Sequence, residues 1–372
     1  MVATKWALAR DEIVRIVHRH TCVRRFAREV TGALRRAVPF DGVSLAAVDP
    51  ATVLPTRRVV MDGVDPALLP RLIEIELRDP DFIKFRALAR QGRLAASVSE
   101  ATRGDLQQSP RNHEFCRPGG FDDELRVVCS DSTGTWGALN LFRESGRPNF
   151  DAFEVGFLAS LAPLVAEGLR RGVMLGDRAS GDQHATGVVV LAPDNSIATA
   201  TPEAERRLAD LAAADTPSGE LPVAVLAVAA RARRLASDYQ TDSDRHESGF
   251  DTFARARVCT AQGNWLTVRG SVLGESPDSP VAVLMEAARP AELAPLIADA
   301  YGLTNRERRV TELVAKGLST NDIGRRLHLS AYTVQDHLKS IFDKTGTGSR
   351  GELVARLFFD YSAPRLLTTE PD

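Results

Sequence analysis

The sequence has few of the residues that build catalytic or metal-binding centres. Its 372 residues include 4 cysteines and 7 histidines. No two cysteines form a CxxC pair, no HxxxH or HExxH arrangement joins the histidines, and no GxxxxGK[ST] or GxSxG segment occurs. The cysteines are Cys22, Cys116, Cys129 and Cys259. We therefore expect no metal site, no cofactor and no enzyme active site, and we interpret the cysteines as structural.

Long apolar runs are also missing. No uninterrupted apolar stretch approaches the roughly 18 residues that span a bilayer. The amino terminus carries Trp6 and Ala7 but then Arg10, Asp11 and Glu12, so it lacks the apolar core of a signal peptide. With 44% hydrophobic and 26% charged residues, the composition is that of a soluble globular protein with room for two or three domains. The expected location is the cytoplasm, without membrane contact.

The chain lacks a strong overall charge, but its charge is unevenly distributed. The net charge is −2, yet residues 301–359 hold ten Lys or Arg against six Asp or Glu, a local +4 that leaves −6 for the remainder. Such a balance excludes a protein that coats nucleic acid. It is compatible with contact to DNA phosphates limited to one basic module.

Residues 1–175 predict a domain with helices at both ends and strands between them. The expected elements are a helical region over the first 40 residues, strands at 43–48 and 58–61, a helix near 66–76, a hairpin of 125–130 with 136–143, and a helix from about 150 to 171. This order favours an α/β sensor-type domain. The polar stretch 176–185 reads as a linker.

Residues 186–289 predict a smaller α+β domain. Two strand-like runs flank the turn at 193–195, and Thr201 followed by Pro202 is typical of a helix start. The polar stretch 237–250 reads as a loop. Three further strands are expected at 253–260, 265–271 and 281–286.

Residues 298–360 predict an all-α module of four helices, followed by a flexible tail at 361–372. Thr304 with Glu307, and Ser349 with Glu352, are capping boxes, and Ser319 with Asp322 is a weaker form of the same device. Helices are expected at 304–316, 320–327 and 331–345 and from 350 onward. Their buried stripes are expected to contain Val310, Leu313, Val314, Ile323, Leu327, Val334, Leu338, Ile341, Leu353, Val354 and Leu357.

The third helix of this module has a polar outer face. Short or unbranched polar side chains, such as Thr333, Gln335 and Lys339, suit a helix that lies in the major groove of DNA. For this helix taken alone, the alternative is that its polar face only contacts solvent. The neighbouring short-turn helix, the caps, and the cations Lys316, Arg325 and Arg326 favour DNA binding, with these cations as phosphate contacts.

The module resembles the LuxR-type (GerE-type) helix-turn-helix family over about 60 residues. The motifs are LTxRE at 303–307, LVAxGLS at 313–319, Ile323 with Leu327, Leu329-Ser330, TVxxHLxxIxxKxG at 333–346 and RxELVA at 350–355. The resemblance implies that the third helix is the recognition helix and that the partner is double-stranded DNA.

The same resemblance assigns roles to individual residues. Gln335, Asp336 and Lys339 fall at the positions that read bases. Backbone contact or support is implied for Thr333, Ser330, His337 and Lys344, and for His337 packing between helices is an equal alternative. This chain has Gln335-Asp336 where most members have a lysine or arginine after Thr-Val, which indicates an unusual target sequence. Members dimerise through the last helix, so Leu357, Phe358 and Phe359 are the candidate seam of a homodimer, with packing in the chain's own core as the alternative for Leu357 and Phe358.

The upstream domains resemble two sensor families by pattern. FDGVSLAAVDP at 40–50, with ELRVV and WGALNLFRE at 124–144, resembles a GAF-type domain, and the opening of 187–205 with its three closing strands resembles a PAS-type domain. In the GAF-type reading Arg126, Trp136 and Asn140 line or edge the sheet, and Trp136 is expected in the core. These resemblances imply an unidentified small-molecule signal.

We therefore interpret the sequence as a one-component transcriptional regulator, with RNA polymerase as a candidate partner. A sigma-factor-like protein and a signalling or interaction protein that does not bind DNA are the alternatives. The turn at 317–319 and the LVA ending favour the regulator, because LTxRER alone also begins sigma-factor helices.

Overall fold

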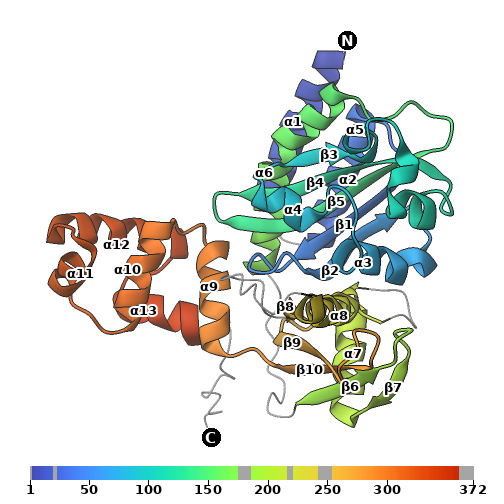
Figure 1. The fold of residues 1–372 in the computed structure, drawn as a ribbon. Helices are drawn as coiled ribbons and strands as arrows, with labels where there is room; N and C mark the ends of the chain where they lie inside the picture. The colour runs from blue at the N-terminus through green and yellow to red at the C-terminus, as the bar shows by residue number, and fades with distance from the viewer. Residues whose placement is uncertain (1, 20–22, 175–185, 216–220, 242–253, 360–372) are drawn as a thin grey trace, which may run out of the picture.

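The computed structural model describes residues 2–19, 23–174, 186–215, 221–241 and 254–359, which form two sheet-containing units and a helical unit (Figure 1). Helices of the first unit are α1 (Val2–Arg19), α2 (Val23–Ala37), α3 (Leu69–Leu77), α4 (Phe85–Arg90), α5 (Val98–Ala101) and α6 (Ala152–Met174). Its strands are β1 (Gly42–Val48), β2 (Pro55–Asp62), β3 (Ala95–Ser97), β4 (Phe121–Asp131) and β5 (Gly134–Glu144), with short helical turns at Pro66–Leu68, Leu106–Gln108 and Asn112–Cys116.

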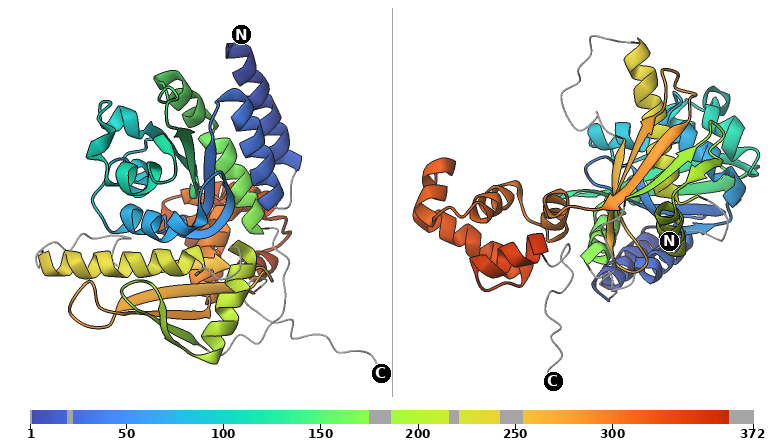
Figure 2. Two further views of the ribbon diagram at one scale, coloured as in Figure 1. Left: turned by 90° about the vertical axis from the view of Figure 1, so that its right-hand side faces the viewer. Right: turned by 90° about the horizontal axis from the view of Figure 1, so that it is seen from below.

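The first sheet is antiparallel, with the strand order β2-β1-β5-β4-β3. Side chains alternate across it, so Leu139 and Leu141 join the core beneath α6, while Ala138 and Phe142 belong to clusters on the other face. Helices α1, α2 and α6 cover one face and α3 to α5 the other (Figure 2). Because every pairing in this sheet is antiparallel, it lacks the parallel strands of an α/β domain, and that expected class is corrected to α+β.

The second unit repeats this sheet topology. It contains β6 (Gly187–Leu191), β7 (Ile197–Ala200), α7 (Pro202–Asp215), α8 (Val223–Thr241), β8 (Arg255–Cys259), β9 (Trp265–Val272) and β10 (Val281–Ala287). Its order is β7-β6-β10-β9-β8. Numbered within each unit, both sheets therefore read 2-1-5-4-3, with the first strand beside the last.

Helix α8 joins the two sheet units. Residues 223–230 are at most 5% exposed, because Val223, Leu226 and Ala227 pack against the first unit and Val225 with Val228 against the second sheet. A helix that is apolar all round is stable only when covered on all sides. The predicted loop at 237–250 is wrong for residues 237–241, which continue α8, and residues 242–250 lie outside the described part of the chain.

Helix α9 (Pro290–Ala300) leads to the helical unit and crosses the expected boundary between 289 and 298. Its Leu296 and Ile297 are buried in the cluster that includes the core of the first unit. Arg170 of α6 donates a hydrogen bond of 2.7 Å to the carbonyl of Ala300. The helical unit is therefore attached through packing as well as through the chain.

The predicted helices and strands of both sheet units are confirmed in their order, and Trp136 is buried as expected. Asn140 is also buried. The predicted linker at 176–185 and tail at 361–372 lie outside the described residues.

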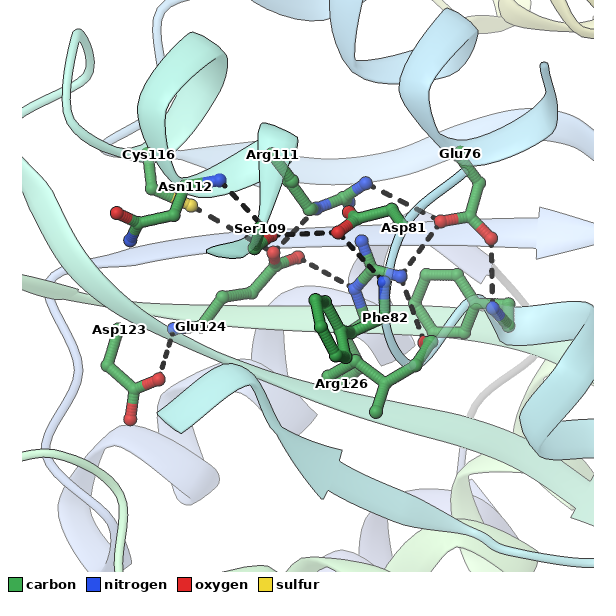
Figure 3. Close-up of polar contacts among 12 residues, drawn as sticks. Glu76, Asp81, Phe82, Ser109, Arg111, Asn112, Cys116, Asp123, Glu124 and Arg126 are labelled. Atoms are coloured by element: carbon green, nitrogen blue, oxygen red, sulfur yellow. Dashed lines mark hydrogen bonds and ion pairs between the residues drawn. The ribbon is translucent and has the colours of Figure 1, made fainter. Parts of the chain in front are cut away.

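A buried network of four charged residues fills the space between β4 and α3 (Figure 3). Arg126 donates to Glu76 at 2.9 Å and to Glu124 at 3.3 Å, and Arg111 donates to Glu124 at 2.5 Å. All four side chains are at most 9% exposed. Burial acts to raise the pKa of Glu124, but the two arginines outweigh it and lower that pKa below its ordinary value. Two cations therefore balance two carboxylates inside the domain.

We predict that Arg126→Met lowers the free energy of unfolding of the first unit by about 3–5 kcal/mol, because it leaves a buried carboxylate uncompensated. Urea unfolding followed by circular dichroism measures the change. Arg25→Ala removes an exposed pair with Glu29 and serves as the control, with an expected loss below about 1 kcal/mol. Equal effects of the two substitutions would contradict the structural role of the network.

Candidate functional site

The helical unit has the caps that its sequence predicts. It contains α10 (Asn305–Ala315), α11 (Thr320–Leu327), α12 (Ala331–Thr345) and α13 (Arg350–Val354), continued by the turn η4 (Ala355–Phe359). The Thr304 hydroxyl accepts from the amide of Glu307, whose carboxylate accepts from the Thr304 amide at 2.7 Å. Ser319 and Ser349 accept from the amides three residues on. The capping box of Thr304 with Glu307 is confirmed, and Ser319 caps α11 as predicted. Ser349 caps α13 through its hydroxyl, but the Glu352 carboxylate accepts from the Gly348 amide, so the reciprocal half of that predicted box is wrong. Ser330 caps α12 in the same way at 3.0 Å from the Thr333 amide.

The turn between α11 and α12 is short because His328 has a left-handed conformation and Gly324 lets the backbone approach closely. His328 has a φ of 56° in the left-handed region. The Leu329 amide donates to the Gly324 carbonyl, and a Cβ added to Gly324 would lie 2.8 Å from the Leu329 carbonyl oxygen. Only glycine fits there. Gly324 is thus a site residue that the sequence reasoning missed, although a glycine inside a short helix is a detectable signal.

The inner faces of the helices form the core of this unit. Val310, Ile323, Val334, Ile341 and Leu353 are all fully buried. Leu313, Val314, Leu327, Leu338 and Leu357 are also buried, while Val354 is half-buried. The stripe predictions are therefore confirmed for all except Val354.

The opposite face of α12 is a polar ridge. Gln335, Asp336 and Lys339 are exposed, and Thr333 and His337 are half-buried. Helices α11 and α12 lie at the end of the unit far from both sheets (Figure 1). The described parts of the chain therefore leave the ridge open to solvent.

Tyr332 lies beside this ridge and was not anticipated from the sequence. It is 74% exposed in the first turn of α12. The sequence feature that could have indicated Tyr332 is an aromatic residue at a position of α12 outside the buried stripe.

The predicted phosphate contacts lie in different environments. Lys316 is exposed at the end of α10, and Arg326 is exposed on α11. Arg325 is also exposed and pairs with Asp322 one turn earlier. The hydroxyl of Ser330, 2.8 Å from that of Thr333, lies at the start of α12. Arg325 and Arg326 lie in the last turn of α11, just before the turn that leads to Ser330, whereas Lys316 lies before the first residue of α11.

Lys344 does not share this position. Its ammonium group donates to both carboxylate oxygens of Glu307, at 2.9 and 2.7 Å. Glu307 is 4% exposed and also accepts from the hydroxyl of Ser340. Of the two roles that the resemblance implies for Lys344, the structure shows support, since this side chain holds α12 against α10.

One residue of the candidate dimer seam is buried within the chain and cannot contact a second copy. Leu357 is 1% exposed and lies in the chain's own core, where η4 contacts α9. Its predicted place in the seam is therefore corrected. The side chains of Phe358 and Phe359 lie outside the described residues.

The described residues offer little support for reactive thiols, a metal site or a membrane-spanning helix. Burial raises the pKa of Cys129 to about 12 and that of Cys259 to about 11, and it raises the pKa of Cys116 as well, so these thiols stay protonated at neutral pH. No group of three or more potential metal ligands occurs among the described residues. By length and composition residues 152–172 of α6 could cross a membrane, but half of that stretch is buried inside the protein, as in a core helix.

Comparison with known proteins identifies the helical unit. Residues 302–357 match the family described as bacterial regulatory proteins, luxR family. The chain is 50% identical over 52 residues to an HTH-type transcriptional regulator, Rv0890c, of Mycobacterium tuberculosis H37Rv, which is 14% of this chain and 6% of that protein. It is 44% identical over 54 residues to the monoamine regulon transcriptional regulator of Klebsiella aerogenes, covering 14% of this chain and 24% of that one.

A longer match is to the transcriptional regulatory protein DesR of Bacillus subtilis, at 32% identity over 96 residues. It covers 24% of this chain and 48% of DesR. The chain thus spans less than half the length of each of these curated relatives.

Solved structures give weaker likenesses. A GAF domain/HD domain protein from Geobacter sulfurreducens is 17% identical, with a TM-score of 0.30, over 42% of this chain and 94% of that one. The VqmA dimer of Vibrio cholerae is 15% identical, with a TM-score of 0.19, over 46% of this chain and 81% of that one. TM-scores this low do not establish a shared fold.

We predict that Glu307 stabilises the helical unit in a pH-dependent way. Burial acts to raise the pKa of Glu307, but hydrogen bonds from Lys344, Thr304 and Ser340 outweigh it and lower that pKa from 4.5 to about 2. A carboxylate with a depressed pKa stabilises the folded state above its unfolded pKa, and this stabilisation is lost as the pH falls through the folded pKa. The unfolding midpoint of Glu307→Gln should therefore lie below wild type at neutral pH, and the difference should vanish between about pH 4.5 and about pH 2.

Thermal melts of the two proteins across this range measure the difference. Glu312→Gln removes an exposed carboxylate of the same helix and is the matched control, with little expected difference at any pH. A Glu307→Gln difference that persists unchanged to pH 2 would contradict the assigned role.

Proposed function

Because residues 302–357 form a LuxR-family helix-turn-helix domain, we propose that the chain is a DNA-binding transcriptional regulator that places α12 in the major groove. The polar ridge of α12 carries this proposal. A helix is about 10–12 Å wide with its side chains, and the major groove is about 12 Å wide. The caps and Glu307 hold α12 firmly in place. This supports a role in base reading, because a small displacement of α12 would weaken its contacts with DNA.

In this proposal three exposed side chains read bases. Glutamine pairs with adenine through two hydrogen bonds, aspartate accepts from the amino group of cytosine, and lysine donates to guanine. Gln335, Asp336 and Lys339 carry these groups on one exposed face. Asp336 next to Gln335 favours a target with cytosine and adenine at neighbouring positions, and it repels phosphates, which sharpens discrimination against other sequences.

The surrounding cations supply affinity that does not depend on sequence. Arg325 and Arg326 are exposed in the last turn of α11, just before α12, where the Ser330 hydroxyl and the first amides of α12 also favour an anion. Lys316 is exposed before the start of α11. The pair between Arg325 and Asp322 is exposed and therefore weak, so Arg325 can turn to a phosphate. His337 is half-buried, so both backbone contact and packing between helices stay open for it.

We propose that the two sheet units are GAF-type and PAS-type sensor domains, with boundaries at 1–175 and 186–289. Their shared 2-1-5-4-3 order, with helices on the sheet faces, supports this assignment. We further propose a cytoplasmic homodimer without enzyme activity, acting on RNA polymerase at paired half-sites. Two-fold symmetry would set these half-sites about 10 base pairs apart, or a multiple of that.

We predict that Lys339→Ala weakens binding to a selected operator duplex about tenfold or more, since a bidentate base contact is worth about 1–3 kcal/mol of discrimination. It should also relax the preference at one base pair in each half-site. Fluorescence anisotropy with the operator and its single-base variants measures both effects. An unchanged affinity and an unchanged preference would remove Lys339 from the base-reading set.

We predict a different result for Lys316→Ala, because a phosphate contact carries no sequence information. Affinity should fall equally for all duplexes, and the slope of log K against log salt should decrease in magnitude by about 0.9. Salt titrations of the same anisotropy assay measure the slope. A loss confined to one sequence would contradict the phosphate assignment.

A further inference from the structure

A cavity of about 630 Å³ lies where α2 and β2 of the first unit meet the end of α7 of the second. Its volume is within the range of about 300–1,000 Å³ that small-molecule sites occupy. The cavity lies in the sheet units, so no residue of the helix-turn-helix lines it.

One wall of the cavity is cationic. Arg24, Arg28 and Arg35 follow one another at helical spacing along one face of α2, and Arg58 of β2 is buried behind them at 5% exposure. Gly32 belongs to the same face and leaves space there, because a Cβ on it would meet only Arg36, at 3.8 Å. Four arginines thus face two aspartates, Asp62 and Asp215, across the lining.

The aspartates do not neutralise this wall. Both carboxylate oxygens of Asp215 accept backbone hydrogen bonds, one from the amide of Arg58 and one from that of Val223 at 2.8 Å. Asp62 pairs with Arg35 at 2.7 Å, but both side chains are exposed, so the pair is weak.

Arg28 is the cation best placed for a ligand. Among the described residues its guanidinium has no hydrogen-bond or ion-pair partner. Arg24, by contrast, donates to the carbonyls of Ala213 and Ala214 at the end of α7. Arginine binds phosphate in bidentate fashion, and the long side chains of Arg28 and Arg35 line the same cavity from one face of α2.

The remaining wall is apolar. Val59, Val60, Met61, Val64 and Pro66 line it. Inorganic phosphate would leave this wall in contact with water, whereas an anion with an apolar body would cover it. The two walls together specify a ligand with one doubly charged end and one apolar end.

We propose that this cavity binds an organic phosphate, with the phosphate between Arg28 and Arg35 and the apolar body against Met61 and Val64. The occupant lies beside the contacts of Arg24 and Asp215 that join the two sheet units, so its binding bears on their junction. This proposal is independent of DNA binding.

Isothermal titration of the full chain with phenyl phosphate tests it, with phenol and inorganic phosphate as matched ligands. We expect saturable binding of phenyl phosphate with a dissociation constant at or below about 1 mM, weaker binding of inorganic phosphate and none of phenol. Arg28→Ala should weaken binding about tenfold or more, because it removes a charge-assisted contact. Arg25→Ala, on the same helix but outside the cavity lining, should leave it unchanged.

A second variant, Gly32→Glu, places a carboxylate on the cationic wall without a clash at its Cβ and should abolish binding. Circular dichroism melts establish that each variant is folded. The proposal is overturned if phenyl phosphate shows no saturable binding, or if Arg28→Ala or Gly32→Glu binds it as tightly as wild type. Equal losses of affinity in Arg25→Ala and Arg28→Ala would also overturn it, because they would indicate unspecific charge attraction. Binding of inorganic phosphate as tight as that of phenyl phosphate overturns the assignment of an apolar body. Since no DNA is present, failure here leaves the regulator proposal untouched.

Discussion

The orientation of α12 depends on one carboxylate, that of Glu307. It completes the cap of α10 through the Thr304 amide, and it accepts from Ser340 and Lys344, two residues one turn apart on α12. Glu307 is almost fully buried, so these bonds are poorly screened by water and define both the distance and the rotation of α12 relative to α10. The polar ridge faces outward because the buried stripe of Val334, Leu338 and Ile341 packs on the other side of the helix.

The two sheet units and the helical unit are also joined by packed helices and buried polar contacts. Helix α8 is covered on one side by the first unit and on the other by the second sheet, and Arg257 reaches from β8 to Asp49 of the first unit at 2.9 Å. Helix α9 packs on α6 and on η4. Arg257 of β8 also donates to the Glu292 carbonyl of α9. A structural change at the junction of the sheet units can therefore reach the helical unit through contacts of β8 and α9.

The sequence predicts what is local. Caps depend on residues three positions apart, and buried stripes on helical spacing, so both were correct for α10 to α12. The first part of α8, residues 223–230, is apolar on all sides, which removes the periodic signal, and α9 is obscured by Pro290 and Pro295. For Lys344 the sequence left backbone contact and support open, because its partner Glu307 lies 37 residues away, and Leu357 was placed in the seam because only the fold brings α9 over it. The network of Arg126 and the arginine-lined cavity likewise combine residues that no sequence spacing connects.

The central claim is that the ridge of α12 reads base edges, and selection of duplexes from a random library by the full chain tests it most directly. The account predicts a salt-sensitive enrichment of one motif in two related half-sites, and a changed motif when the selection is repeated with Gln335→Ala. A library that emerges without an enriched motif, or a motif identical for both proteins, would contradict it.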